Sequence, residues 1–278
     1  MLSQHDVHQR IAMRKKDFSL ERALYCDPGV YTADLEQIFY REWLFAVPAC
    51  ELAKPGAYAT MQVGACPVVV IRGKDMRIRA FHNVCRHRAS PLVQDCAGHV
   101  DRISCPYHRW LYDFEGRLKG APSMEIDKDE FGLFPVHCAV WRGLVFVSID
   151  PEAPIEEWLK DIAMAALRYP IEELKLAREF TIEADVNWKT YGDNYAEAWH
   201  IPTIHPGLNA SIDMASYKIE TVGNTLQSHT ADARDGGKTD GFWVWRLPGL
   251  FFNMYNWGMN VAQLEPTGPR SMRLTYRY

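Results

Sequence analysis

Two short cysteine–histidine motifs constrain this chain of 278 residues more than any other part of it. The first motif reads Cys85-Arg86-His87, and the second reads Cys105-Pro106-Tyr107-His108. Each motif presents one thiolate and one imidazole, which are ligands that iron and zinc accept. Pro91 and Gly98 between the motifs, and Gly116 after them, indicate short strands joined by tight turns. The chain is therefore expected to bring four metal-binding side chains together on two loops.

This ligand set suits two kinds of metal centre. A structural zinc ion accepts two cysteines and two histidines, but zinc motifs usually pair like ligands, as in C-x2-4-C and H-x3-5-H. A Rieske-type [2Fe–2S] cluster needs two cysteines on one iron and two histidines on the other. Because each motif here is mixed, the sequence predicts that Cys85, His87, Cys105 and His108 bind a Rieske cluster, with zinc as the alternative.

Composition narrows the class of protein further. Hydrophobic residues make up 47% of the chain and aromatic residues 12%, which is enough to fill more than one core. The net charge of −4 and the lack of a long basic run argue against a nucleic-acid partner. No apolar stretch approaches 18 residues and the first 16 residues are polar, so we expect neither a transmembrane helix nor a secretory signal. Seven cysteines without a disulfide-type pattern favour free thiols and a cytoplasmic location.

Apolar runs bounded by turn residues predict a β-rich domain around the two motifs. Residues 1–42 read as a helical segment, in which Thr32 is expected to cap a helix that carries Leu35, Ile38 and Phe39. The β-rich domain is expected at 43–150, and the Pro-rich segment 151–154 is expected to be a linker. The strands expected in this domain are 43–47, 67–71, 78–81 and 144–149.

The remaining segment, 151–278, predicts a second domain that mixes helices with strands. An amphipathic helix is expected at 155–169, a strand at 180–186 and a helix at 187–199 with Asn187 as its cap. Residues 217–278 are strand-like throughout. The fold class is therefore α+β, with a helix-flanked antiparallel sheet in the second domain.

A second group of metal-binding residues lies at the end of the expected helix 187–199. Asp193, Glu197 and His200 are spaced by four and three residues, so on a helix they would share one face. His200 and His205 are five apart and would point about 140° apart on a straight helix. Pro202 and Pro206 favour a bend that lets the two rings converge. Two histidines and one carboxylate form the Fe(II) site of non-haem oxygenases.

The two groups together resemble the large (alpha) subunit of Rieske non-haem iron oxygenases, the ring-hydroxylating dioxygenase family with its monooxygenase and demethylase relatives. The resemblance runs from about Trp43 to the end of the chain. It implies a homotrimer in which electrons pass from NAD(P)H through a reductase or ferredoxin to the Rieske cluster. From there they reach the mononuclear Fe(II) of the neighbouring subunit, where O₂ is used to hydroxylate or demethylate a small organic substrate.

The resemblance also implies roles for individual residues. His200 and His205 match the two iron-binding histidines of the family. Glu197 matches the acidic residue that links a Rieske histidine of one subunit to an iron-bound histidine of the next. Asn194 and Asp193, from the same motif, are the other expected catalytic residues. A glutamate at position 197 is typical of the branch that acts on carnitine, choline or betaine-type compounds, which favours quaternary ammonium substrates over aromatic rings.

One feature of the family has no counterpart in this sequence. The third iron ligand of the family is a carboxylate on a helix beyond the sheet, whereas this chain ends on the strand-like segment 271–278. We therefore expect a truncated chain whose third ligand lies beyond residue 278. Two alternatives remain open, namely a Rieske electron-transfer protein and a catalytically dead, truncated oxygenase. The carboxylates after His205, none of which matches the motif, are Asp213, Glu220, Asp232, Asp235, Asp240 and Glu265.

Overall fold

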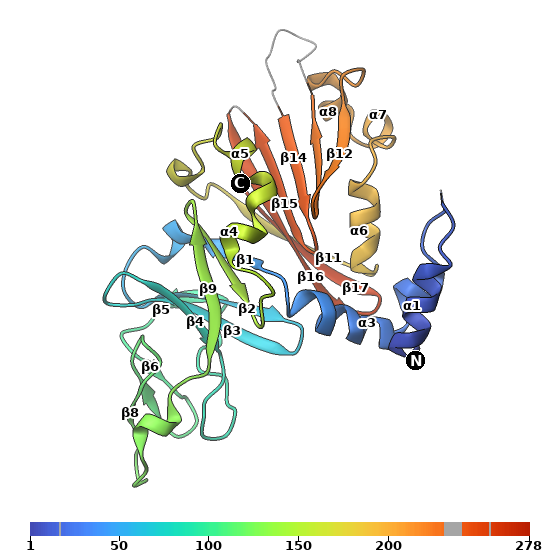
Figure 1. Ribbon diagram of the computed structural model, residues 1–278. Helices are drawn as coiled ribbons and strands as arrows, with labels where there is room; N and C mark the ends of the chain where they lie inside the picture. The colour runs from blue at the N-terminus through green and yellow to red at the C-terminus, as the bar shows by residue number, and fades with distance from the viewer. Residues whose placement is uncertain (17, 231–240, 256) are drawn as a thin grey trace. The chain divides into compact units, whose positions relative to one another are not determined.

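The computed structural model describes residues 1–16, 18–230, 241–255 and 257–278, and the chain divides into two compact units. The β unit comprises Tyr40–Ile155, and the α+β unit joins Met1–Phe39 to Glu156–Tyr278 (Figure 1). The expected α+β class is confirmed by these two units. The domain limits expected from the sequence, 1–42, 43–150 and 151–278, stay a prediction.

The β unit is built on an antiparallel sheet of seven described strands, in the order β1-β10-β9-β4-β3-β2-β5. A separate three-stranded sheet, β6-β7-β8, carries the second cysteine–histidine motif on the loop before β7. The strands are β1 (Leu44–Pro48), β2 (Ala57–Val63), β3 (Cys66–Arg72), β4 (Ile78–His82), β5 (Ala97–His99), β6 (Ile103–Ser104), β7 (Leu111–Tyr112), β8 (Leu118–Gly120), β9 (Pro135–Trp141) and β10 (Leu144–Ser148).

Four of these strands were expected from their apolar runs, and all four are confirmed within two residues at either end. They are β1, β3, β4 and β10. Each carries consecutive buried residues, because the sheet is covered on both faces over that length. Val145, Phe146 and Val147 of β10, for example, have no exposed surface.

The α+β unit holds a second antiparallel sheet of seven described strands, in the order β11-β17-β16-β15-β14-β13-β12. From β12 to β17 each strand pairs with the next along the chain, while β11 returns to pair with β17. The strand expected at 180–186 and the strand-like character of 217–278 are confirmed for the described residues. The strands are β11 (Glu179–Ala184), β12 (Lys218–Val222), β13 (Thr225–His229), β14 (Gly241–Arg246), β15 (Leu250–Tyr255), β16 (Gly258–Gly268) and β17 (Ser271–Arg277).

The helices depart from the sequence expectations at their ends. The N-terminal segment is helical as expected, but the helix expected to start at Thr32 begins at Pro28, because Asp27 caps it by accepting from the Gly29 amide. The helices are α1 (Gln4–Ala12), α2 (Arg22–Cys26), α3 (Pro28–Asp34), which continues as the π-helix Leu35–Phe39, α4 (Ile155–Trp158), α5 (Lys160–Ala166), α6 (Trp188–Tyr195), α7 (Ile201–Ile204) and α8 (Pro206–Ser211).

The prediction of a single helix at 155–169 was wrong, because the segment forms two helices, α4 and α5, that are separated at Leu159. The Nε of Arg246, a buried residue of β14, donates to the Trp158 carbonyl at 3.0 Å, and its guanidinium lies 4.3 Å from the Trp158 ring centroid. The Ile162 amide donates to Leu159 instead, at 3.0 Å. A tertiary hydrogen bond thus takes the carbonyl that an unbroken helix would have used.

A buried ion pair ties α3 to α6, the helix that leads into the expected iron site. The Asp34 carboxylate accepts from Lys189 and, at 2.9 Å, from the indole Nε1 of Trp188. The side chains of Asp34 and Lys189 are only 9% and 14% exposed. The Trp188 ring also packs edge-on against Phe39, with centroids 5.0 Å apart. These contacts fix where α6 begins.

Replacement of Asp34 by alanine is expected to lower the free energy of unfolding by about 3 kcal/mol, because it leaves the buried Lys189 ammonium unpaired. Denaturant unfolding followed by tryptophan fluorescence would measure the change. Glu36→Ala, at an exposed site two residues away, is the control and should change the value by less than about 0.5 kcal/mol. Equal stability of the two variants would contradict the role given to this pair.

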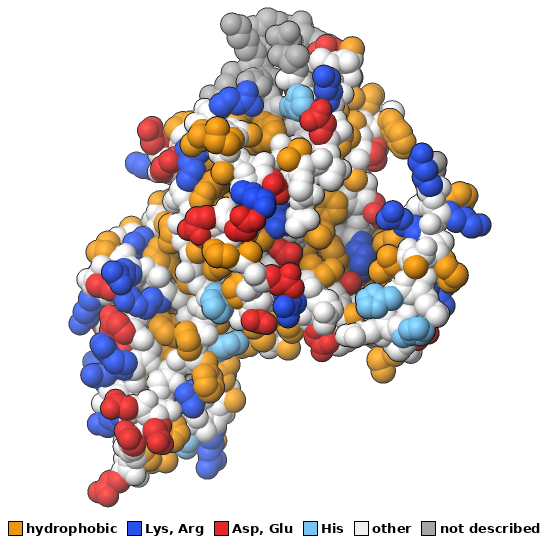
Figure 2. All heavy atoms as spheres, in the orientation of Figure 1, with side chains coloured by type: hydrophobic (Ala, Val, Ile, Leu, Met, Phe, Trp, Pro, Cys, Tyr) orange, Lys and Arg blue, Asp and Glu red, His pale blue; other side chains and the backbone are white. Residues whose placement is uncertain are grey.

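Charge on the surface is mixed rather than gathered by sign. On the face that Figure 2 shows, acidic and basic side chains are interspersed between hydrophobic ones over each unit. The chain as a whole has 31 Lys and Arg against 35 Asp and Glu residues. Of the described helices, none combines the length and the apolar character that crossing a bilayer requires.

Candidate metal centres

The two cysteine–histidine motifs adopt the same loop. In the first, the Cys85 amide donates to Ser90 at 2.9 Å and the Cys85 carbonyl accepts from Ala89 at 3.0 Å. In the second, the Cys105 amide donates to the Trp110 carbonyl at 2.8 Å, and its carbonyl accepts from Arg109 at 3.1 Å. The fifth residue of each loop has a positive φ, 53° for Ala89 and 60° for Arg109. Each cysteine therefore opens a six-residue loop of the same shape.

These loops bring the four expected ligands together. The His87 and His108 rings lie 4.6 Å apart between centroids, and the side chains of Cys85 and Cys105 are in contact. Cys85 and Cys105 are buried, with 2% and 1% exposure. The His87 ring stacks on Trp110 at 4.9 Å, with only 6° between the planes. The two sulfurs and the two imidazoles thus lie on adjacent loops, and their role as cluster ligands stays a prediction.

Two observations fit these residues to an iron–sulfur cluster. The Nδ1 atom of His87 is buried, and it has no hydrogen-bond partner within the described ranges. A buried ring nitrogen without a partner is costly unless it binds something else. Burial alone would raise the pKa of the Cys105 thiol, but the backbone N–H groups of His108 and Tyr107 hold that pKa below its usual value. The loop is therefore arranged for a thiolate at Cys105, which is the form that binds metal.

Tyr112, which has no exposed surface, lies beside the first sulfur. Its hydroxyl oxygen accepts from the Arg86 amide at 3.2 Å and lies 3.5 Å from Cys85 Sγ. Because the oxygen is already an acceptor for the amide, its proton is free to point at the sulfur. Burial, and then the contact with Cys85, raise the pKa of this phenol far above its usual value. Tyr112 is therefore placed to donate a hydrogen bond to Cys85 Sγ.

Replacement of Tyr112 by phenylalanine is expected to lower the midpoint potential of the bound cluster by about 40 mV. Hydrogen bonds to cluster sulfurs favour the reduced state, which is more negative. Loss of about 1 kcal/mol corresponds to this shift for a one-electron couple. Redox titration followed by visible spectroscopy measures it, with the buried Tyr58→Phe as a control that should leave the potential unchanged. An unchanged potential in Tyr112→Phe would contradict this role.

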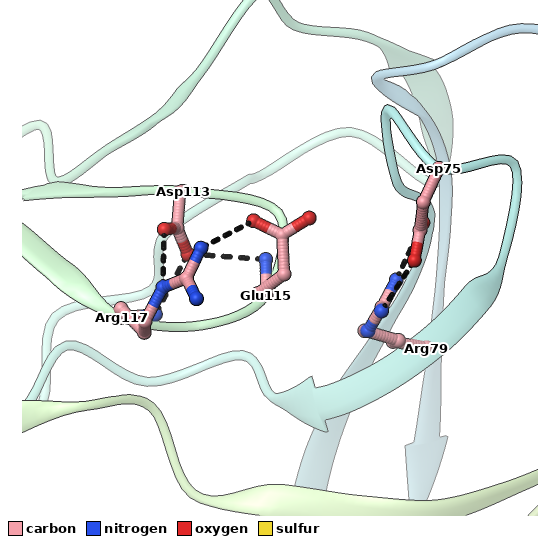
Figure 3. Close-up of polar contacts among 5 residues, drawn as sticks. All are labelled: Asp75, Arg79, Asp113, Glu115 and Arg117. Carbon is pink, nitrogen blue, oxygen red and sulfur yellow. Dashed lines mark hydrogen bonds and ion pairs between the residues drawn. The ribbon is translucent and has the colours of Figure 1, made fainter.

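Charged side chains fix the turn that follows β7, the strand that ends at Tyr112 (Figure 3). The Asp113 carboxylate accepts from the amides of Glu115 and Arg117 at 3.1 and 2.8 Å, and from Arg117 Nε at 2.8 Å. In the turn between β3 and β4, Arg79 donates twice to Asp75, at 2.9 and 2.7 Å. The first of these turns holds β7 in register with β8.

The second group of expected ligands lies where α6 gives way to two short helices. The helix expected to run to Trp199 ends at Tyr195. His200 immediately precedes α7, and His205 stands between α7 and α8, which begins at Pro206. The two rings lie 5.1 Å apart between centroids, with 77° between their planes. The bend expected from the prolines is confirmed, and it lets both rings face the same space.

Glu197 contacts His200 of its own chain. One carboxylate oxygen accepts from the Nδ1 of His200, and the other accepts from the amides of Trp199 and His200. Burial opposes ionisation of Glu197, but the His200 ring and these amides hold its pKa below the usual value. With Nδ1 bound to the carboxylate, the Nε2 of His200 is left to bind a metal ion. The expected link from Glu197 to a neighbouring subunit stays a prediction.

The other residues of this motif are placed differently. Asn194 lines the cavity described below, together with Glu197 and both histidines. Asp193 does not line that cavity, since it accepts at 2.6 Å from the Tyr25 hydroxyl on α2. Burial and the contact with Asp193 raise the pKa of Tyr25 to about 12. Asp193 therefore does not share a face with Glu197 and His200, because α6 ends before position 197. Its catalytic role stays a prediction.

No third ligand joins the two histidines in the described part of the chain. Among those residues, which include the four expected cluster ligands, no group of three or more His, Cys, Asp or Glu side chains is gathered closely enough to hold one ion, whereas a [2Fe–2S] cluster needs only two of them on each iron. Glu265 is occupied elsewhere, in an ion pair with Arg273 at 3.1 Å. Asp232, Asp235 and Asp240 lie outside the described residues. The expectation that a third ligand lies beyond residue 278 stays a prediction.

A cavity of about 470 Å³ lies beside His200 and His205. Asn253 and Asn260 line it from the sheet, and Leu208 lines it from α8. Trp199 and Trp257 do not line it and are 88% and 68% exposed. The aromatic residues that line the cavity are Tyr191, Tyr195, Tyr217, Trp243, Tyr255 and Tyr276.

Sequence reasoning missed several of these residues. Tyr217, Asn253 and Tyr276 lie far apart in the sequence and come together only in the folded unit, where Asn260 lies opposite Asn253. A signal was present for one pair, since Asn253 and Tyr255 are two apart in a strand and so share a face. Nothing in the sequence alone indicates which of the two faces lines a cavity.

The fold and the two ligand groups define a Rieske protein with a second, mononuclear metal site, and comparison with known proteins narrows the class. Residues 42–134 match the Rieske [2Fe-2S] domain, and residues 171–238 match the catalytic domain of ring hydroxylating alpha subunits. The carnitine monooxygenase oxygenase subunit of Acinetobacter pittii is 32% identical over 279 residues, which cover 94% of this chain and 72% of that protein. The chain therefore belongs to the alpha subunits of the Rieske non-haem iron oxygenases.

Two further relatives show how far the likeness extends. The glycine betaine monooxygenase oxygenase subunit of Pseudomonas aeruginosa is 38% identical over 199 residues, 70% of this chain. The chain matches about half the length of that protein, 46%. The quaternary ammonium Rieske monooxygenase CntA in complex with L-carnitine superposes with a TM-score of 0.83 at 30% identity, covering 92% of this chain and 73% of that one. Membership implies two cofactors, a Rieske [2Fe–2S] cluster and a mononuclear iron.

Proposed function

We propose that this chain is the oxygenase subunit of a monooxygenase that hydroxylates or demethylates a small quaternary ammonium compound. The observation that carries the proposal is the lining of the cavity beside His200 and His205. Six aromatic rings and the Glu197 carboxylate surround it. Aromatic faces attract a cation that has no hydrogen to donate, by about 0.5–2 kcal/mol for each ring.

The names of the relatives support this substrate class. They are oxygenase subunits of glycine betaine, carnitine and choline monooxygenases, whose substrates all carry a trimethylammonium group. The held-down pKa of Glu197 keeps a negative charge at the cavity wall, which favours a cation over a neutral ring compound.

The expected ligands of the two cofactors lie in different units, those of the cluster in the β unit and those of the iron in the α+β unit. Cys85, His87, Cys105 and His108 would hold the cluster, and His200 and His205 would provide two ligands of the iron. When bound, the cluster supplies electrons and the iron supplies the site of O₂ activation. Glu197 fixes the ring orientation of His200 by accepting from Nδ1. The Tyr112 hydroxyl would donate a hydrogen bond to the sulfur of Cys85.

The electron-carrier alternative is not favoured. A Rieske carrier would need only the β unit, whereas residues 171–238 match a catalytic domain and bring two histidines to a cavity. The electron donor in this proposal is NAD(P)H, acting through a separate reductase or ferredoxin.

The test pairs choline with a neutral analogue of the same shape. The iron-loaded oxygenase, supplied with a Rieske-oxygenase reductase and NADH, is offered choline and, separately, 3,3-dimethyl-1-butanol, in which carbon replaces the nitrogen. Carnitine, glycine betaine and naphthalene complete the series. We expect substrate-dependent O₂ consumption with formation of product for at least one ammonium compound and none for the neutral compounds. Turnover of naphthalene or of the butanol at an equal rate would overturn the proposal.

We further propose a homotrimer and a cytoplasmic location. Each unit carries a large exposed aromatic side chain beside its ligand group, Trp199 at 88% and Tyr107 at 61% exposure, and exposed hydrophobic residues favour contact with another copy. The seven cysteines are all free, as a reducing compartment requires. Light scattering of the iron-loaded protein tests the assembly, and a monomeric mass at micromolar concentration would contradict it.

A further inference from the structure

Three polar side chains, linked by hydrogen bonds, lie among the aromatic residues that line the cavity. Asn253 of β15 lies directly opposite Asn260 of β16. The Asn253 amide nitrogen donates to the Asn260 Oδ1 at 2.9 Å, and the Tyr195 hydroxyl donates to the Asn253 Oδ1 at 2.8 Å. All three residues line the cavity. The chain of hydrogen bonds thus runs in one direction, from α6 across two strands.

The direction of this chain leaves a donor at its end. The oxygen of Asn260 is taken by Asn253, and that is the one hydrogen bond of the Asn260 side chain within the part of the protein that the structure describes. Asn260 is 8% exposed, and the cavity that it lines also holds His200 and His205. The Nδ2 of Asn260, for which the described residues provide no acceptor, is therefore open to a ligand in that cavity.

The Asn260 amide is held by its neighbours in this series of hydrogen bonds. Since Tyr195 and Asn253 hold the amide in one orientation, its N–H₂ group is preorganised for a ligand.

We propose that Asn260 determines substrate specificity by donating a hydrogen bond from Nδ2 to an oxygen atom of the substrate, a hydroxyl or a carboxylate. This inference rests on the proposed function, in which the aromatic rings receive the ammonium group. It adds a second point of recognition, so that the cavity binds a compound with both a cation and an oxygen acceptor. A site built to hydrogen-bond a substrate oxygen discriminates against analogues that lack it.

The experiment measures binding rather than turnover. Calorimetric titration of the iron-loaded protein without O₂ compares choline, glycine betaine and tetramethylammonium, which has the cation but no oxygen. Asn260→Ala is expected to weaken binding of choline or glycine betaine about tenfold and to leave tetramethylammonium within about twofold. Retained binding of tetramethylammonium shows that the variant is folded. Asn209→Ala, on α8 and outside the cavity lining, is the control and should leave all three affinities unchanged.

A second variant distinguishes the two oxygen acceptors. Asn260→Asp replaces the donor by a carboxylate of the same shape. A carboxylate ligand such as glycine betaine would then be repelled, whereas the hydroxyl of choline can donate to the new carboxylate and keep its affinity. If Asn260→Asp loses binding of glycine betaine but not of choline, the acceptor is the carboxylate. If Asn260→Asp keeps both ligands while Asn260→Ala binds choline more weakly, the acceptor is the hydroxyl.

Each remaining outcome contradicts one statement. Equal weakening of all three ligands in Asn260→Ala, or no change in any, would overturn the role of Asn260 while leaving the ammonium site intact. If none of the three compounds binds the unsubstituted protein, the proposed function itself fails, and the inference fails with it.

Discussion

Replacement of Cys105 by serine will remove the visible absorbance and the EPR signal of a reduced Rieske cluster. Cys105 is 1% exposed, and backbone N–H groups stabilise its thiolate. A serine hydroxyl cannot provide a soft, ionised ligand in that buried place. Because changes outside the ligand shell already cost 10–100-fold in metal affinity, loss of a ligand should lower cluster occupancy by at least about tenfold. Absorbance, EPR and iron analysis of the purified protein measure this.

The matched control is Cys96→Ser, at an exposed thiol in the same β unit, which should keep the full cluster content. If Cys105→Ser retained the signal, the ligand assignment would be wrong. A colourless unsubstituted protein that contained one zinc ion would instead support the zinc alternative for the same four residues.

Replacement of His205 by alanine will separate the two metal centres. Iron content should fall from about three to about two per chain, because the mononuclear site loses one of its two histidines while the cluster stays. Product formation should fall by at least about 100-fold. The EPR signal of the reduced cluster should not change, since His205 belongs to the α+β unit and the cluster ligands belong to the β unit.

His229→Ala is the control for this substitution, because His229 ends β13 and does not line the cavity. It should keep both metals and the activity. A His205→Ala protein that still held three irons would refute the assignment of the mononuclear site to this pair of histidines.

Strands could be predicted where a run of apolar residues is buried on both faces. β10 has five buried residues in succession, and turn residues bound it in the sequence. β2 and β9 were not predicted, because only part of each is buried and their patterns are interrupted. Each also pairs with a strand far from it in the sequence, β2 with β5 and β9 with β4, and no local pattern reveals these partners.

Helix ends could not be predicted where a side chain captures a backbone group. Arg246 takes the Trp158 carbonyl and breaks the helix between α4 and α5. Glu197 accepts from the amides of Trp199 and His200, so the chain starts a new turn there instead of extending α6. Both effects require a partner that a reading of hydrophobic periodicity does not identify.

The candidate sites also differ in whether a local sequence pattern reveals them. The cluster ligands and His200 with His205 could be predicted, because the ligands of each centre are few, rare in type and close in sequence. The cavity could not, because residues such as Tyr217, Asn253 and Asn260 come from separate segments of the chain and none is unusual by itself. For Asp193 the sequence pattern was misleading. Its spacing suggested that it shares a helix face with Glu197 and His200, but α6 ends before position 197 and Asp193 instead accepts a hydrogen bond from Tyr25.

The repeated loop geometry at Cys85 and Cys105 has a consequence for recognising distant relatives. Each loop closes on itself through two backbone hydrogen bonds and a residue with positive φ, so its length is fixed by its own closure. Residues 91–104, which join the loops, take no part in either closure. Insertions and deletions should therefore accumulate in that joining segment and be absent inside the two hexapeptides. Searches that score the hexapeptides separately and leave the distance between them open should find relatives that a fixed spacing would exclude.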